Sequence, residues 1–262
     1  MGLRPELDIS RTISRFPPKL AGEIIYSLYM GNKRDLYEDS NRIRMKNKIQ
    51  IFGQENLNHI GNTSVFIVFN HPVTPVLVEG IFTLLAILSD DDIAGRKDIT
   101  LIAAGEIPSK KNAYFPWSIS FMKKLAYIYN INDDETTRIL LVPNNKLRPD
   151  YREGRKKVNS AIRSQLARGG IVALAGEGDW GENINQTKKD SDLRHGAGQI
   201  AIDTVETFGG KVLPVAIAVS LNGMPYLQIG EPLIPRSSDK KDVSLQIAES
   251  IKAMLPKEMV VR

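Results

Sequence analysis

Short apolar runs alternate with helix-like segments along this 262-residue chain, and that alternation most limits what it can fold into. The runs are rich in valine, isoleucine and leucine, which is typical of strands buried on both faces of a sheet. They lie at residues 46–52, 64–69, 99–104, 139–142, 171–175 and 211–219, with an expected edge strand at 226–230. Strands separated by helices predict an α/β fold with a mixed, largely parallel sheet flanked by helices.

Helices are expected between these strands. Their predicted positions are 72–88, 117–127, 151–168, 198–208 and 243–254. Before the first strand, residues 10–36 predict one or two amphipathic helices, broken at Pro17-Pro18 and at Gly31. The predicted organisation is therefore an N-terminal helical extension, residues 1–44, followed by one α/β domain, residues 45–262.

The composition excludes several classes of protein. The chain has no cysteine, which removes disulfides, thiolate nucleophiles and sulfur-ligated metals and favours a cytoplasmic location. No secretory signal is visible at the N-terminus. The most apolar segment, 76–88, is shorter than the roughly 20 residues that a membrane span needs, and it contains Glu79.

The net charge of +5 is concentrated near the N-terminus, where residues 1–50 carry 10 Lys/Arg against 6 Asp/Glu. A basic end can meet nucleic acid, an anionic membrane surface or only water. The basic run 152–157 contains no aromatic side chain on which bases could stack, so it predicts a solvated helix face, and we expect no nucleic-acid partner.

Neither a cofactor nor a metal is predicted. Residues 176–181 match G-x-G-x-x-G after a strand, but the polar run 182–192 follows where a dinucleotide site needs a helix. Two carboxylates inside the motif would also face the pyrophosphate. A zinc site is not expected, because the chain lacks cysteine and has no histidine pair at helical spacing.

His71 is the best-placed of the three histidines, because it follows the strand 64–69 in the sequence Asn70-His71-Pro72. In α/β sheets ligands bind at the carboxyl ends of the strands. His59 lies in a polar stretch that predicts a surface turn, and His195 is expected to precede or cap a helix. A purely structural role for His71 is the alternative.

Several segments, in order, resemble the lysophospholipid and glycerol-phosphate acyltransferase family. The resemblance covers about residues 45–235 and rests on 49–57, 66–71, 101–129, 169–178, 193–198, 212–217 and 230–232. The family moves an acyl chain from coenzyme A or acyl carrier protein to a hydroxyl group. The resemblance implies that His71 is the general base, and that an aspartate five residues later should orient it.

This chain departs from the family at that fifth residue, which is Val76. A histidine without a carboxylate partner is a poor base, because the carboxylate fixes the tautomer and stabilises the imidazolium. Glu79, one helical turn further on, is the first candidate for the missing partner. Glu106 is the second candidate, and Thr74 supplies only a neutral hydrogen bond.

The resemblance also implies a substrate-binding set: Asn70, Glu106, Glu177, Gly178, Trp180 and Arg194. The family's phosphate-binding arginines have no counterparts at the matching positions. Arg138, Lys188, Lys189 or Arg194 would have to replace them, and solvated surface charge is the alternative for each. Trp180 then lines an apolar or sugar-like acceptor site or caps the core.

The sequence therefore predicts an acyltransferase-like protein with a lysophospholipid or related lipid or glycolipid acceptor. The N-terminal helices are expected to contact the inner face of a membrane through Tyr26, Tyr29 and Met30, with Lys33-Arg34 nearby; packing on the main domain is the alternative. The alternative function is a catalytically degenerate lipid-binding or scaffold protein of the same fold, which Val76 favours.

Overall fold

The computed structural model describes residues 16–70, 74–105, 108–110, 113–114, 117–130, 138–143, 150–176, 195–220 and 224–256. The strands are β1 (Gln50–Phe52), β2 (Val65–Phe69), β3 (Ile99–Ala104), β4 (Pro108–Lys110), β5 (Ala113–Tyr114), β6 (Ile139–Val142), β7 (Ile171–Ala175), β8 (Lys211–Val219) and β9 (Pro225–Ile229). The helices are α2 (Pro18–Met30), α3 (Leu36–Lys46), the 3₁₀ helix η1 (Gln54–His59), α4 (Thr74–Ser89), α5 (Ser118–Tyr129), α6 (Tyr151–Ala167), α7 (His195–Ile202), the π-helical turn η2 (Asp203–Thr207) and α8 (Lys240–Met254).

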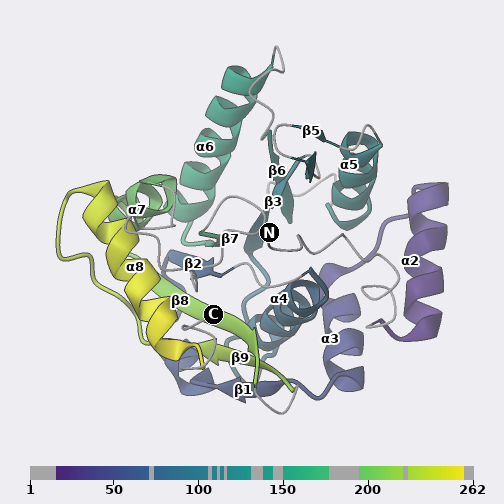
Figure 1. The fold of residues 1–262 in the computed structure, drawn as a ribbon, viewed down its shortest axis with the longest axis horizontal. Coiled ribbons are helices and arrows are strands. Elements are labelled where there is room, and N and C mark those ends of the chain that lie inside the picture. Colours follow the sequence, from purple (N-terminus) through teal and green to yellow (C-terminus); the bar gives the residue numbers. More distant parts are fainter. Residues whose placement is uncertain are drawn as a thin grey trace.

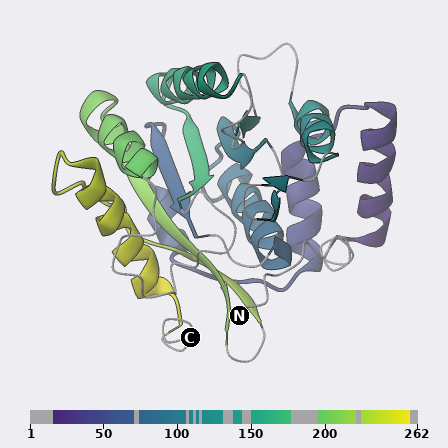
Figure 2. The same ribbon diagram turned by 45° about the horizontal axis from the view of Figure 1, so that its top comes forward.

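Seven of these strands form one sheet in the order β1-β9-β8-β2-β7-β3-β6, and β4 pairs with β5 separately. Neighbours in the large sheet run parallel except β8 and β9, which are antiparallel. Helices cover both faces of the sheet (Figures 1 and 2). The mixed, largely parallel α/β fold expected from the sequence is confirmed.

The position of strand β2 between two hydrophobic cores explains its unbroken run of apolar residues. Its residues are buried on both faces. Phe66 and Val68 belong to the core under α6, α7 and α8, whereas Val65, Ile67 and Phe69 belong to the core under α3, α4 and α5. Period-two alternation therefore divides one apolar strand between two cores.

Helix α4 comes from the most apolar stretch of the sequence and packs against α3, β8 and β9. Its hydrophobic residues therefore face other protein elements on several sides. Among the described residues, no helix combines the length and the apolar character that crossing a bilayer requires.

One expectation about the sheet is wrong, and one helix was not predicted as a separate element. Strand β9 is not an edge strand, because β1 pairs with it in parallel, with Gln50 opposite Tyr226. Helix α3 was not expected, because its sequence is strongly polar. Its N-cap, Asp35, accepts hydrogen bonds from the backbone N–H groups of Tyr37 and Glu38, and Leu36 and Ile43 supply a narrow buried stripe.

The expected breaks around α2 are confirmed. The helix begins after Pro17, and it ends at Gly31, whose φ of 74° places it in the left-handed region that glycine favours. The boundary between the extension and the domain at residues 44 and 45 stays a prediction.

A charged cluster joins α2, α3 and α5. The Arg34 guanidinium makes a bidentate pair with Asp39, at 2.6 and 2.7 Å, and also donates to Glu23 at 3.2 Å. Tyr129 of α5 donates to Asp39 at 2.9 Å. The hydrogen bond from Arg42 lowers the pKa of Glu23 to about 2, and burial raises the pKa of Tyr129. The charge of Arg34 is therefore paired with carboxylates of the protein itself.

Candidate active site

The carboxyl ends of the central parallel strands lie side by side. The Gly176 N–H, just after β7, donates to the Phe69 carbonyl at the end of β2 over 3.0 Å. Gly105 directly follows β3, and its N–H donates to the Val142 carbonyl of β6 over 2.8 Å. This edge is where α/β sheets bind ligands, because the loops that leave the strands gather there.

Asn70 ties the end of β2 to β8. Its side-chain Nδ2 donates to the Ile217 carbonyl at 2.8 Å, and the Ile217 N–H donates to Asn70 Oδ1 at 2.7 Å. The side-chain amide thus acts like one more peptide group in the parallel pairing of the two strands. Asn70 is 6% exposed, and this pair of bonds fixes the point at which the chain leaves the sheet. The expected role of Asn70 in substrate binding stays a prediction.

Helix α4 approaches the same residue of β8 through Gly80. A Cβ atom at Gly80 would lie 2.5 Å from Ile217 Cγ2, which is closer than real side-chain contacts allow. Glycine is therefore required there if α4 is to pack this tightly on the sheet. Ile217 therefore contacts both Asn70, through its backbone, and helix α4, through its side chain.

Glu79 lies on a buried face of α4. It is 2% exposed, and Val76, one turn earlier, is 5% exposed. Thr83, one turn later, is fully buried, and its Oγ1 has no hydrogen-bond partner among the described residues. Polar groups removed from water are costly, and titratable groups in such surroundings concentrate at functional sites. Glu79 and Thr83 thus form a buried polar strip on an otherwise apolar helix.

Most of the site residues predicted from the sequence lie outside the described residues: His71, Glu106, Glu177, Gly178, Trp180 and Arg194. In the sequence, three of them directly follow described strand ends: His71 follows Asn70, Glu106 follows Gly105, and Glu177 follows Gly176. The described ends of β2, β7 and β3 lie at one edge of the sheet. Arg194 directly precedes α7.

Arg138 does not lie at this edge. It directly precedes β6, and its carbonyl accepts a hydrogen bond from Leu101, so it lies at the amino end of the strands. Its guanidinium carbon lies 4.7 Å from the ring centroid of Tyr37, and the guanidinium donates to the Tyr37 hydroxyl. Burial raises the pKa of Tyr37 to about 12. The structure therefore does not bring Arg138 to the edge at which the acceptor phosphate is expected.

Sequence reasoning missed the roles of Ile217 and Gly80. The available signal was a glycine inside a strongly apolar helical segment, which indicates a close approach of the backbone. No feature of the sequence around Gly80 identifies Ile217 as the residue that it contacts. Within the described ranges, no three histidine, aspartate or glutamate side chains gather closely enough to hold a metal ion.

Comparison with known proteins supports the fold. No protein-family model matches the chain, and no curated protein sequence matches it. Among solved structures, it is similar to the crystal structure of the 1-acyl-sn-glycerophosphate (LPA) acyltransferase PlsC from Thermotoga maritima, with a TM-score of 0.51 and 16% sequence identity. The match covers 97% of this chain and 88% of that one. The chain therefore shares the overall fold of that protein.

Proposed function

We propose that this protein is an acyltransferase that moves a fatty acyl group from acyl-CoA or acyl carrier protein to a hydroxyl of a lysophospholipid or related lipid or glycolipid. The observation that carries the proposal is the double hydrogen bond between Asn70 and Ile217. It fixes the strand end directly before His71, at the edge of the sheet where ligands bind. The similarity of the fold to an acyltransferase supports the choice of reaction.

The reaction needs one base. In the proposal His71 accepts the proton of the acceptor hydroxyl while that oxygen attacks the thioester carbonyl. A tetrahedral intermediate forms, its C–S bond breaks, and the thiol leaves with the proton that His71 returns. Glu79 is proposed to orient and stabilise His71 in place of the aspartate that Val76 replaces.

The remaining residues are proposed to bind substrate. Glu106, Glu177 and Gly178 follow adjacent strand ends in the sequence, Trp180 supplies an apolar surface for the acceptor, and Arg194 supplies a positive charge. The location proposed is cytoplasmic and peripheral on the inner face of a membrane. Tyr26, Tyr29 and Met30 of α2 are exposed, as lipid contact through the N-terminal helices requires.

A second candidate is a lipid-binding or scaffold protein that has kept this fold without its chemistry. Val76 favours it, because the buried face of α4 carries an apolar side chain where the family has its carboxylate. The two candidates differ in thioester cleavage, which only an enzyme catalyses.

The test is release of free thiol from long-chain acyl-CoA and acyl-acyl carrier protein, with lysolipid, glycerol-phosphate and glycolipid acceptors. The protein contains no cysteine, so a thiol reagent reads the released coenzyme A or carrier thiol without background from the enzyme. We expect His71→Ala to lower kcat by roughly 10²–10⁴-fold and Glu79→Gln to lower it less.

His59→Ala is the matched control, because His59 is an exposed residue of η1. Its rate should equal that of the wild type. Equal rates for wild type and His71→Ala would exclude His71 as the base. Acyl-chain binding without acceptor-dependent thiol release would favour the scaffold candidate.

A further inference from the structure

The outer face of α2 is apolar and exposed. Ile25, Tyr26, Tyr29 and Met30 are 54%, 57%, 82% and 53% exposed, and no charged residue lies between them in the sequence. The opposite face of the helix, with Leu20, packs inward. Single exposed hydrophobic residues are ordinary, but an apolar stripe along one short helix marks an interaction surface.

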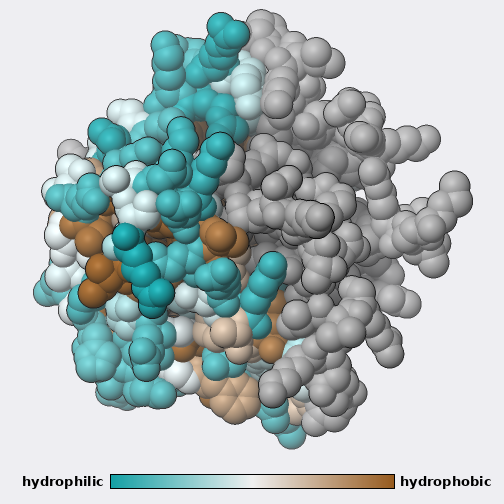
Figure 3. All heavy atoms as spheres, turned by 60° about the vertical axis from the view of Figure 1, so that its left-hand side comes forward, coloured by the Kyte–Doolittle hydropathy of each residue, from teal (hydrophilic) through white to brown (hydrophobic). Residues whose placement is uncertain are grey.

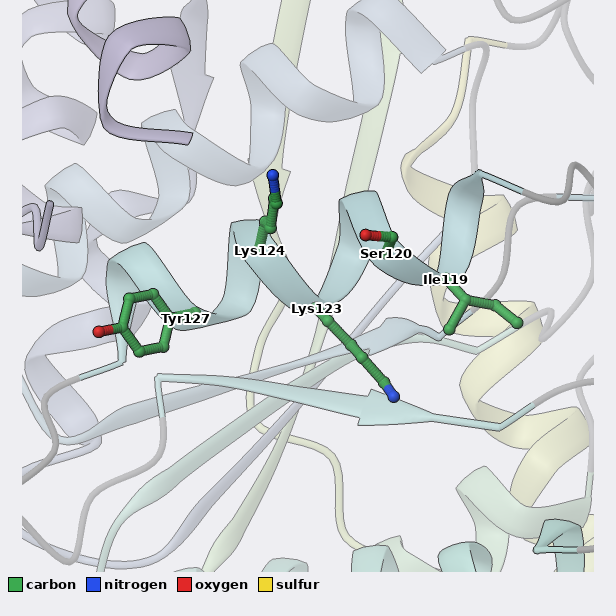
Figure 4. A pocket seen from close by; sticks show the side chains of 5 residues that line it. All are labelled: Ile119, Ser120, Lys123, Lys124 and Tyr127. Atoms are coloured by element: carbon green, nitrogen blue, oxygen red, sulfur yellow. The ribbon is translucent and has the colours of Figure 1, made fainter. Parts of the chain in front are cut away.

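Helix α5 carries a different exposed surface, which combines aromatic and basic side chains. Trp117 and Phe121, at its start, are exposed and pack edge to face with ring centroids 5.9 Å apart. Further along the helix, Lys123, Lys124 and Tyr127 line an open groove of about 560 Å³ (Figure 4). Within the described part of the chain, neither lysine has a carboxylate at ion-pair distance.

The two surfaces meet at the C-terminal ends of the helices. Gly31, directly after α2, lies against the Tyr127 ring, because a Cβ built there would be 3.7 Å from Tyr127 Cε1. Lys33 Nζ lies 3.7 Å from the centroid of that ring and donates to the Tyr127 carbonyl at 2.6 Å. Figure 1 shows α2 and α5 as neighbours on one side of the molecule.

Both basic residues expected beside α2 bond to other groups of the protein, although Lys33 is exposed. Lys33 bonds to carbonyls of α5 and its C-cap, and Arg34 pairs with the buried Asp39. Lys123 and Lys124 of α5 are also exposed, and their side chains leave the helix in different directions (Figure 4). Together with the exposed Lys33, these two lysines place positive charge beside the apolar face of α2.

We infer that α2 and α5 form one membrane-docking surface, in which α2 supplies apolar side chains and the α5 lysines bind anionic lipid headgroups. Tyrosine and tryptophan favour the boundary between headgroups and acyl chains, and lysines beside them are attracted to an anionic leaflet. Protein interfaces are instead depleted of lysine. The described surface over α7 and α8 is mostly hydrophilic, with only small hydrophobic patches (Figure 3).

This inference deepens the proposed function, because an enzyme with a lipid acceptor must meet it at a membrane. The test uses the full chain in vesicle co-sedimentation, with vesicles of phosphatidylcholine alone or mixed with phosphatidylserine. The double variant Lys123→Gln/Lys124→Gln should lower affinity for the mixed vesicles about 30-fold, since each lysine near an anionic surface contributes roughly a factor of five. Affinity for pure phosphatidylcholine should not change.

Lys156→Gln/Lys157→Gln is the matched control. It removes the same charge from an adjacent, exposed pair on α6 and should change affinity by less than about two-fold. Tyr29→Ser/Met30→Ser should weaken binding to both kinds of vesicle by at least about tenfold.

Three results would overturn the inference: no vesicle binding by the wild type, equal losses for the two lysine pairs, or self-association that the α2 variant abolishes without any vesicle binding. Vesicle binding does not depend on acyl transfer. A failure of the His71 assay would therefore leave this result standing, and the reverse also holds.

Discussion

The two edges of the sheet use side chains in different ways. At the amino edge, Arg96 is 5% exposed and donates to the carbonyls of Gly61, Thr63 and Gly169 while it makes a bidentate pair with Asp98. At the carboxyl edge, the Asn70 amide makes its paired bonds to the backbone of one residue, Ile217.

The two edges therefore differ in what their buried polar side chains support: stability alone at the amino edge, and stability together with the proposed chemistry at the carboxyl edge. Arg96 joins three loops through these hydrogen bonds, and its partners lie away from the proposed site. Asn70 secures a strand end whose next residue is the proposed base. We therefore expect changes at the amino edge to alter stability alone, and changes at the carboxyl edge to alter stability and rate together.

The largest expected effect is that of Arg96→Ala. It removes the hydrogen bonds to three loop carbonyls and to Asp98, and we expect the free energy of unfolding to fall by about 3 kcal/mol in urea titrations. The rate of acyl transfer per folded molecule should not change. Arg163→Ala is the control, because its ion pair with Asp203 is largely exposed on the arginine side and should contribute about 1 kcal/mol or less. A loss of rate for folded Arg96→Ala would break the proposed division.

The next effect is that of Asn70→Leu, which keeps a similar volume but loses both bonds to Ile217. We expect a loss of about 2 kcal/mol in unfolding free energy, because a buried N–H and a buried C=O lose their partners. In contrast to Arg96→Ala, kcat should also fall, since a small displacement of a base is costly in rate. Unchanged kcat in the folded variant would show that Asn70 does not position the site.

The smallest effect is that of Gly80→Ala, which tests the close packing of α4 on β8. The added methyl group overlaps Ile217 Cγ2, and the cost of overpacking exceeds the gain in helix propensity by about 1 kcal/mol. Gly22→Ala in α2 meets nothing within 4 Å and should instead stabilise the protein by about 0.5–1 kcal/mol. Stabilisation by both substitutions would show that Gly80 is not needed for packing.

The sequence predicted the buried strands better than the contacts between distant segments. Strands β3, β6, β7 and β8 were predicted at their observed bounds, because an unbroken run of apolar residues identifies a strand buried on both faces. Helix α3 was not predicted, because a charged residue such as Asp39 is expected on the surface. Only the structure shows that Asp39 is buried and bonded to Arg34 and Tyr129. Asn70 was assigned to substrate binding by the family resemblance, but its side-chain bonds reach a residue 147 positions away.

The sequence by itself determined the local features of this protein. These are the burial of the main strands on both faces, the end of α2 at Gly31, and the exclusion of thiol chemistry by the absence of cysteine. Only the tertiary structure decided that β1 borders β9, that Arg138 lies at the amino edge, and that Ile217 meets both Asn70 and Gly80. The physical reason is that periodicity and backbone preference act over a few neighbouring residues. Strand order and buried polar pairing instead depend on contacts between segments far apart in the chain.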